Sequence, residues 1–210
     1  MPDAKTNRER VVIVGKTRMG GGVCVGGMIE GTGTPLRLFP VGGFCQPPDT
    51  PFDVGDVWEM SLHKRPTHEP PHSEDHDEWD ALRVGKVADL RSWILSKQQP
   101  VKGGPARLFG GRLGCTSTGK YFLTRNPPVP DWSTTFWEIP FALIHYKKDN
   151  ADRYRFDEGV PFDVKYVGHR PAERRLRNRT LVRVSLARWF TTAEAEAQDQ
   201  KCWLQLSGWF

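Results

Sequence analysis

The stretch VVIVGKTRMGGGVCVGGMIE, residues 11–30, sets the pattern for the fold. Four β-branched residues at 11–14 favour an extended strand, and the three glycines at 20–22 favour a tight turn. A second apolar run follows from Val23 to Glu30. The segment therefore predicts a strand, a glycine-bearing turn and a returning strand.

The same stretch ends its first strand with Gly15-Lys16-Thr17, like a phosphate-binding loop. That motif, G-x-x-x-x-G-K-[ST], needs a glycine where this chain has Arg10, and it needs a helix directly after the threonine. Both requirements fail here, so we do not predict an NTPase. Two alternatives stay open: Lys16 and Arg18 contact the phosphates of a polymer beside the turn, or the turn is a permissive hairpin without a ligand.

The composition favours many short strands over long helices, because 21 of the 210 residues are glycine and 17 are proline. The net charge of +5 is unevenly spread. Residues 1–105 hold 13 Lys and Arg against 14 Asp and Glu, whereas residues 106–210 hold 17 against 11. The positive second half suggests an anionic partner.

The cysteines and the N-terminus indicate the compartment. The four cysteines are scattered and form no C-x-x-C pair, which favours reduced thiols over a disulfide framework. The first ten residues are polar, and no apolar run approaches membrane-spanning length. We therefore expect a soluble, cytoplasmic protein without a membrane partner.

Short apolar segments recur along the chain between Gly, Pro, Asn and Asp residues. We expect strands at 11–17, 23–30, 35–40, 57–64, 81–90, 106–113, 120–124, 136–147, 160–168, 180–190 and 202–210. This all-β pattern is typical of small barrels or sandwiches. A capping box of Thr191 and Glu194 predicts one short helix before the last strand, and a helical turn at 89–97 stays open.

Two heptapeptides hint at a duplication. PFDVGDV begins at Pro51 and PFDVKYV begins at Pro161, and five of their seven positions match. The polar segment SKQQPVKGGP at 96–105 has the composition of a linker. We therefore predict two tandem five-stranded barrels, residues 1–100 and residues 101–210.

Several stretches carry a resemblance to a known family: VGKTRMGGGVCVGG (14–27), LRLFP (36–40), PFDVGDVWEM (51–60), PPHSEDH (70–76) and CWLQLSGWF (202–210). Together they resemble the dual-OB domain family of prokaryotic proteins. The resemblance implies two OB-fold barrels and a nucleic-acid-binding or sensing module in genome-defence and conflict systems. OB barrels commonly hold single-stranded nucleic acid on a strand face, with loops closing over it.

The segment RPAERRLRNRTLVR, residues 170–183, is the strongest functional signal. It holds six arginines and one acid, Glu173; the arginines are Arg170, Arg174, Arg175, Arg177, Arg179 and Arg183. Arginine binds phosphate with a planar fork and stacks on bases. The segment lies between two expected strands, so we expect a projecting loop. We interpret it as a nucleic-acid contact; an acidic protein partner and a solvated loop without a role are the alternatives.

The last expected strand adds aromatic residues. Period-two alternation places Cys202, Leu204 and Leu206 on one side and Trp203, Gln205, Ser207 and Trp209 on the other. Trp203 and Trp209 are therefore candidates to stack on bases. The alternative is that this face packs against the other barrel.

The segment HEPPHSEDHDEWD, residues 68–80, carries six acids and three histidines. His72 and His76 stand four apart, but the prolines argue for a loop, in which that spacing does not define zinc ligands. We predict no metal site. The segment is expected to contact a basic partner or to lie over a basic groove in the absence of ligand.

These observations predict a non-catalytic protein that binds single-stranded DNA or RNA as an accessory or sensor subunit of a prokaryotic defence system, without a cofactor. No G-x-S-x-G elbow or other nucleophile motif is present. One alternative is a protein–protein adaptor that docks an effector enzyme through its acidic and basic loops. Another is a metal-dependent nuclease that uses the acids at 68–80.

Overall fold

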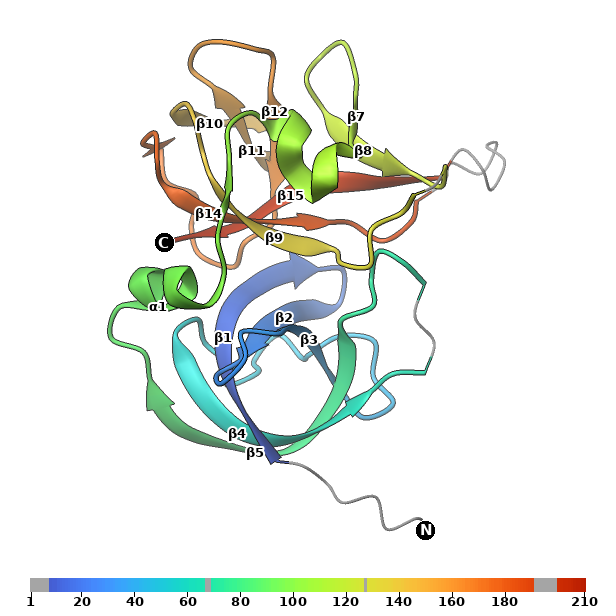
Figure 1. Cartoon of the computed structure of the whole chain (residues 1–210), viewed down its shortest axis with the longest axis vertical. Helices are drawn as coiled ribbons and strands as arrows, with labels where there is room; N and C mark the ends of the chain where they lie inside the picture. Colours follow the sequence, from blue (N-terminus) through green and yellow to red (C-terminus); the bar gives the residue numbers. More distant parts are fainter. Residues whose placement is uncertain (1–7, 67–68, 127, 191–199) are drawn as a thin grey trace. The chain divides into compact units, whose positions relative to one another are not determined.

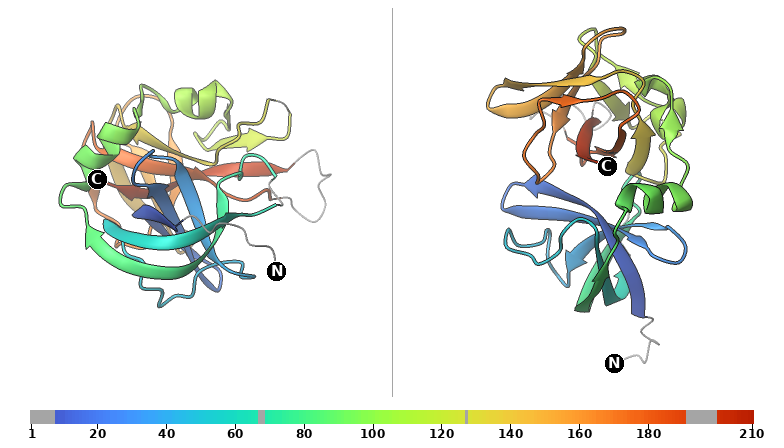
Figure 2. Two further views of the ribbon diagram at one scale, coloured as in Figure 1. Left: turned by 60° about the horizontal axis from the view of Figure 1, so that its bottom comes forward. Right: turned by 90° about the vertical axis from the view of Figure 1, so that its left-hand side faces the viewer.

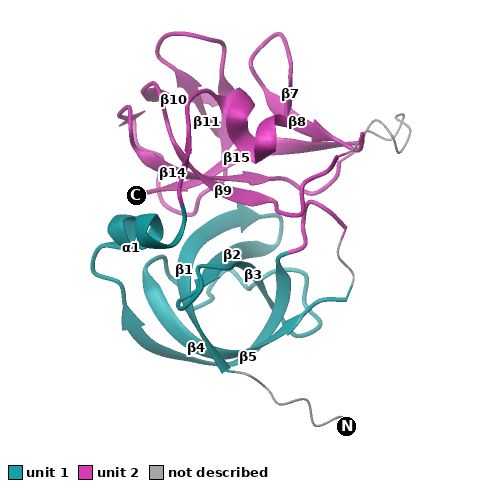
Figure 3. Ribbon diagram, in the orientation of Figure 1, with its two compact units in different colours: residues 1–68, 74–98 teal, residues 69–73, 99–210 magenta. Residues whose placement is uncertain are grey.

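The structure is a computed structural model that describes residues 8–66, 69–126, 128–190 and 200–210 (Figure 1). The chain divides into two compact units, which Figure 3 colours separately. Unit 1 comprises Met1–His68 and Glu74–Gln98, and unit 2 comprises Glu69–Ser73 and Gln99–Phe210. The elements of unit 1 are β1 (Arg8–Met19), β2 (Gly22–Ile29), β3 (Pro35–Pro40), β4 (Asp56–Lys64), β5 (Asp75–Lys86) and α1 (Leu90–Lys97). Those of unit 2 are β6 (Val101–Lys102), the 3₁₀ helix η1 (Pro105–Gly111), β7 (Gly114–Cys115), β8 (Tyr121–Thr124), β9 (Thr134–Glu138), β10 (Leu143–Lys148), β11 (Ala151–Phe156), β12 (Asp163–Tyr166), β13 (Arg175–Leu176), β14 (Leu181–Leu186) and β15 (Lys201–Trp209).

Unit 1 is a closed barrel with the strand order β1-β2-β3-β5-β4. β3 and β5 run parallel and the other neighbours run antiparallel. The barrel closes because β1 is long enough to pair with both β2 and β4, and the strands curve strongly around it (Figure 2). Alternate residues such as Val25 and Leu38 face the core. Gly27 lies where any Cβ would clash with Val11, so this close packing of β2 on β1 requires glycine.

Unit 2 repeats this order with one interruption. Its sheet runs β10-β11-β12-β15-β14-β9, and β12 lies parallel to β15, as β3 lies parallel to β5. β9 pairs with β14 and β10 pairs with β11. The residues between β9 and β10 include Pro140, which has no backbone N–H to donate. β9 and β10 together therefore take the place of β1, and the single strand expected at 136–147 is two strands.

The prediction of an all-β protein with two OB barrels is confirmed, since both units show this topology. The described residues also include α1, which settles the open alternative at 89–97. Asp89 caps this helix by accepting a hydrogen bond from the backbone N–H of Ser92 at 3.0 Å. The helix expected from Thr191 falls at 191–199, outside the described residues.

Three expectations about local structure were wrong. Residues 106–113, expected as a strand, fall largely in η1, because Phe109 and the two glycines after it adopt left-handed backbone angles. β11 was not expected at all. The matching heptapeptides are not equivalent, since PFDVGDV at 51–57 leads into β4 whereas PFDVKYV at 161–167 contains β12, the counterpart of β3.

Candidate nucleic-acid interface

Unit 2 presents a row of polar side chains across four neighbouring strands. Tyr146 on β10 lies opposite Arg153 on β11, which lies opposite Lys165 on β12, which lies opposite Gln205 on β15. Residues that lie opposite one another in a sheet share a face. With Arg155, two residues beyond Arg153, this row forms what we call the cationic face.

The cationic face points away from the core because of strict alternation. On β11, Tyr154 and Phe156 are buried in the core of unit 2, so Arg153 and Arg155 lie on the opposite side. On β12, the buried Val164 and Tyr166 flank Lys165, which is exposed. The apolar residues thus fix the direction in which the cations point.

One acid lies within the cationic face. Asp163 accepts a hydrogen bond from Arg153 Nε at 2.7 Å and another from the Tyr146 hydroxyl at 2.8 Å. Burial raises the pKa of Tyr146, and the bond to Asp163 raises it further, so the phenol is protonated at neutral pH and donates. Arg155 Cζ lies 5.6 Å from the centre of the Tyr146 ring. Asp163 therefore orients Arg153 and Tyr146, while Arg155 and Lys165 are exposed.

An aromatic cluster continues this face along β15. Trp203 precedes Gln205 by two residues and shares its side of the strand. Phe122 on β8 lies opposite Trp203, and the two ring centroids are 5.3 Å apart. Lys201 Nζ lies 4.8 Å from the centre of the Phe122 ring. The structure thus brings the predicted Trp203 together with Phe122 of β8 and with Lys201 of its own strand.

The arginine-rich segment borders the cationic face at its other edge. Arg175 lies opposite Ile144 of β10, and Ile144 lies opposite Arg155. Arg175 also pairs with Asp157 at 2.6 Å. The other exposed arginines of the segment are Arg170, Arg174, Arg177 and Arg179. The segment is therefore a loop anchored by β13 to β10, with several guanidinium groups at the surface.

Two predicted site residues are not exposed as expected. Lys16 is buried in β1, where Nζ donates to the Thr50 carbonyl at 3.1 Å and pairs with Asp53 at 3.2 Å. Arg183 is buried in β14 and donates to Ser207 Oγ at 3.1 Å. The cause is that both lie within barrel strands and not in the loops beside them.

The last two predicted residues lie elsewhere. Arg18 is exposed near the end of β1 in unit 1. Trp209 packs against the core residue Tyr166, with ring centroids 5.1 Å apart, and donates to Glu173 Oε1 at 3.1 Å. A bulge between β14 and β15 skips Ser207, so the simple alternation assumed for the end of β15 does not continue to Trp209.

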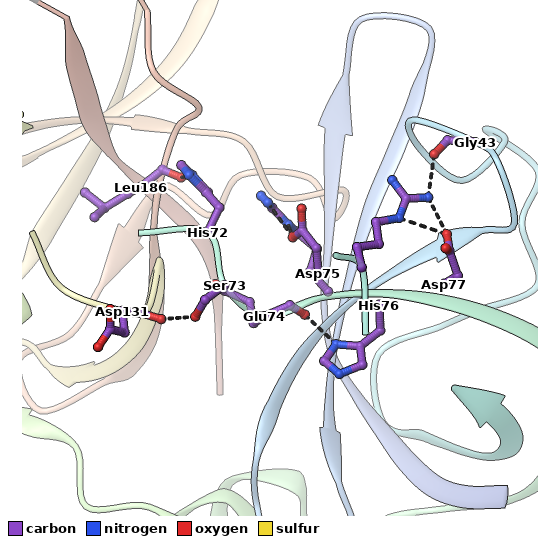
Figure 4. Close-up of polar contacts among 11 residues, drawn as sticks. Gly43, His72, Ser73, Glu74, Asp75, His76, Asp77, Asp131 and Leu186 are labelled. Atoms are coloured by element: carbon purple, nitrogen blue, oxygen red, sulfur yellow. Dashed lines mark hydrogen bonds and ion pairs between the residues drawn. The ribbon is translucent and has the colours of Figure 1, made fainter. Parts of the chain in front are cut away.

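The acidic segment at 68–80 is a loop only in its first part: residues 69–74 form turns, and β5 follows, as Figure 4 shows from His72 to Asp77. His72 is buried, with Nε2 3.2 Å from the Leu186 carbonyl, and Ser73 donates to the Asp131 carbonyl. From Asp75 onward the chain forms β5. His68 lies outside the described residues.

Two acids of β5 form ion pairs within unit 1. Asp75 pairs with Arg37 at 2.6 Å, and Asp77 pairs with Arg65 at 2.5 Å (Figure 4 draws the second pair). In the described part of the chain, no three His, Cys, Asp or Glu residues come together as metal ligands. These acids therefore act as partners of their own barrel's arginines.

Sequence reasoning missed Arg153, Arg155 and Lys165. The signal was present as the alternation R-Y-R-F at 153–156, in which charged and aromatic residues take turns as in a half-buried strand. β11, which contains this alternation, is only six residues long. It comes soon after the single long strand that we expected at 136–147. The pairing of β11 with β12 could not be read from either strand alone.

Two barrels with this strand order define a tandem OB-fold protein. The chain belongs to the family of dual OB-containing domains, whose sequence profile matches residues 9–209. No match was found among curated proteins. Neither helix in the described part of the chain has the length and apolar character that a membrane-crossing helix needs.

Two solved structures are similar over nearly the whole chain. One is described as structural mimicry for functional antagonism, with a TM-score of 0.37, 8% identity, and coverage of 97% of this chain and 93% of the other. The other is the crystal structure of the p204 HINb domain, with a TM-score of 0.35, 8% identity, and coverage of 96% and 97%. At such low scores neither likeness bears on function.

Proposed function

We propose that unit 2 binds single-stranded nucleic acid on its cationic face. The observation that supports this is the row from Tyr146 to Gln205, in which the cations Arg153, Arg155 and Lys165 lie on β11 and β12, the counterparts of the second and third strands of an OB barrel. OB folds use this strand face for oligonucleotides. Arg155 and Lys165 contact phosphates, and the arginine-rich segment extends the contact at the β10 edge.

The aromatic cluster supports a single strand over a duplex. Trp203 and Phe122 share the face with the cations. An unpaired base of any identity can stack on such rings. A duplex keeps its bases inside, so it gains only the phosphate contacts. We therefore expect a preference for single strands of either DNA or RNA.

The same proposal makes the protein a non-catalytic accessory or sensor subunit of a prokaryotic defence system, acting in the cytoplasm. Family membership supports a binding module, because OB folds are generally binding domains. The nuclease alternative required the acids at 68–80 to hold a metal. The pairing of Asp75 and Asp77 with arginines gives that alternative no support.

The test is fluorescence anisotropy with labelled single-stranded and duplex DNA and RNA at two salt concentrations. The face variant is Arg155→Glu/Lys165→Glu, and the loop variant is Arg174→Glu/Arg175→Glu/Arg177→Glu. The wild type should bind single strands with an affinity that falls steeply with salt, by a slope of about 0.7 per phosphate contacted. The face variant should lose at least about tenfold in affinity, since it reverses two charges.

A matched control is Lys64→Glu/Lys86→Glu, which reverses two exposed charges in unit 1. It should bind as the wild type does. Equal losses in the control and the face variant would mean that net charge, and not this face, governs binding. No binding by the wild type at low salt would overturn the proposal.

An adaptor role is the second candidate, because unit 1 exposes an apolar turn. Between β3 and β4, Phe44 is 89% exposed and Val41 is 67% exposed. Arg65 holds this turn by donating to the Gly43 carbonyl at 2.7 Å. Ordered apolar side chains at the surface favour contact with a partner protein. A Phe44→Ser variant that lost a co-purifying effector, yet kept nucleic-acid affinity, would support this second role.

A further inference from the structure

Unit 2 contains a second cationic segment that has no role in the cationic face. Residues 99–130 include five Lys and Arg but no Asp or Glu. Three of these cations, Lys102, Arg107 and Arg112, lie on and around η1, and all three are exposed. No ion pair joins any of the three to a described acidic residue.

Two close approaches of the backbone bring the chain positions of the three cations near one another. A Cβ on Gly103 would lie 3.1 Å from Arg107 Cδ, so the Arg107 stem lies against the glycine that follows Lys102. A Cβ on Gly111 would lie 3.6 Å from the Ala106 carbonyl oxygen, so the two ends of η1 meet. Arg112 therefore leaves the chain close to Arg107. We call residues 102–112 the basic glycine loop.

The backbone of this loop changes from left-handed to right-handed angles at Arg112. Phe109 (φ 51°), Gly110 (φ 69°) and Gly111 (φ 76°) are left-handed, whereas Arg112 (φ −95°, ψ 2°) is right-handed. Left-handed backbone at a residue with a side chain, such as Phe109, is costly and is found most often at functional sites.

The core holds this loop in a fixed position. Leu108 and Phe109 are 0% and 1% exposed and belong to the core of unit 2. The Trp137 indole donates to the Gly103 carbonyl at 2.9 Å. The cations therefore project from an anchored scaffold, which lowers the entropy cost of binding.

We propose that Lys102, Arg107 and Arg112 form a phosphate-binding site. Two guanidinium forks and one ammonium group suit a compact anion with several acceptor oxygens. Phosphate of this kind comes from a polynucleotide or from a free nucleotide. The first source deepens the proposed function, and the second is independent of it.

The experiment measures binding of inorganic pyrophosphate by isothermal titration calorimetry at low salt. The wild type is compared with Arg107→Gln/Arg112→Gln and with the control Lys64→Gln/Lys86→Gln. All four changed side chains are exposed, and thermal unfolding checks that each variant folds. The wild type and the control should bind pyrophosphate alike, and the double arginine variant should bind at least about tenfold more weakly.

Anisotropy with one oligonucleotide, carrying either a 5′-phosphate or a 5′-hydroxyl, identifies the source. Tighter binding of the phosphorylated form, lost in the double arginine variant, assigns the site to a chain end. Equal weakening of both forms assigns it to the backbone. A response to pyrophosphate alone assigns it to a free nucleotide. The pyrophosphate titration therefore tests the site even if no oligonucleotide binds.

Two results would overturn the phosphate site. One is equal pyrophosphate affinity, or none, in the wild type and the double arginine variant. The other is a glutamate peptide of equal charge that binds as tightly as pyrophosphate and depends on the same arginines, since this would make the loop a general anion contact.

Discussion

The two barrels carry a cation at the same place in the fold and use it in different ways. In unit 1, Arg37 on β3 lies opposite Asp75 on the parallel strand β5. In unit 2, Lys165 on β12 lies opposite Gln205 on the parallel strand β15. Arg37 is 9% exposed and ion-paired, whereas Lys165 is exposed.

The antiparallel neighbours of the two cations also differ. On the antiparallel side, Arg37 lies opposite Gly26, whereas Lys165 lies opposite Arg153. Burial would lower the pKa of Arg37, but the nearby charges, including Asp75, raise it above its ordinary value. The comparison teaches that the residue opposite a cation on the outer face of a strand decides whether the cation pairs with an acid or stays exposed.

The largest expected effect comes from breaking the pair in unit 1. Arg37→Ala removes the ion pair to Asp75, which is 3% exposed, and should lower the free energy of unfolding by about 3–5 kcal/mol. Urea unfolding measures this change. Lys165→Ala serves as the control at the corresponding position and should stay within about 0.5 kcal/mol of the wild type. Equal losses at both positions would remove the distinction between the two barrels.

Copying the unit 1 arrangement into unit 2 should have an intermediate effect on binding. Gln205→Asp places a carboxylate opposite Lys165, so the cation gains an internal partner. We expect affinity for single-stranded oligonucleotides to fall about three- to tenfold, and the salt slope to fall by about 0.7. Gln205→Asn controls for the shorter side chain. Unchanged affinity in the aspartate variant would show that Lys165 does not contact the ligand.

The smallest expected effect comes from removing the acid within the cationic face. Asp163→Asn releases Arg153 from its ion pair and should raise affinity for single strands about two- to fivefold, because one negative charge near the phosphates is lost. The variant keeps an Oδ1 acceptor for the Tyr146 hydroxyl but loses its charge, and a hydrogen bond to a neutral acceptor is weaker, so stability should fall by about 1 kcal/mol. Anisotropy and urea unfolding measure the two effects. Weaker binding would mean that Asp163 is needed to position Arg153.

Much of the fold followed from local sequence. The segment 35–40 became β3 with the expected bounds, and 202–210 became β15 within one residue, because apolar alternation and flanking turn residues mark strands directly. The failures arose where backbone chemistry is special. Pro140 divides a long strand, and the left-handed residues at 109–111 turn an apolar run into η1.

The candidate site could be predicted only in part. Sequence identified the arginine-rich segment and Trp203, because charge density and aromatic residues are visible without knowing neighbours. It could not show that Lys16 and Arg183 lie inside strands, where their side chains bond to Asp53 and Ser207. Burial depends on which strands pair, and that information is not local.

The sequence by itself determined an all-β chain with a basic second half, because side-chain period, turn residues and charge are properties of the chain. Only the tertiary structure decided that Arg153, Lys165 and Trp203 share one face and that Asp75 faces Arg37. The physical reason is register: a shift of one residue between paired strands sends every side chain to the opposite face. Register is set by the packing of the whole barrel.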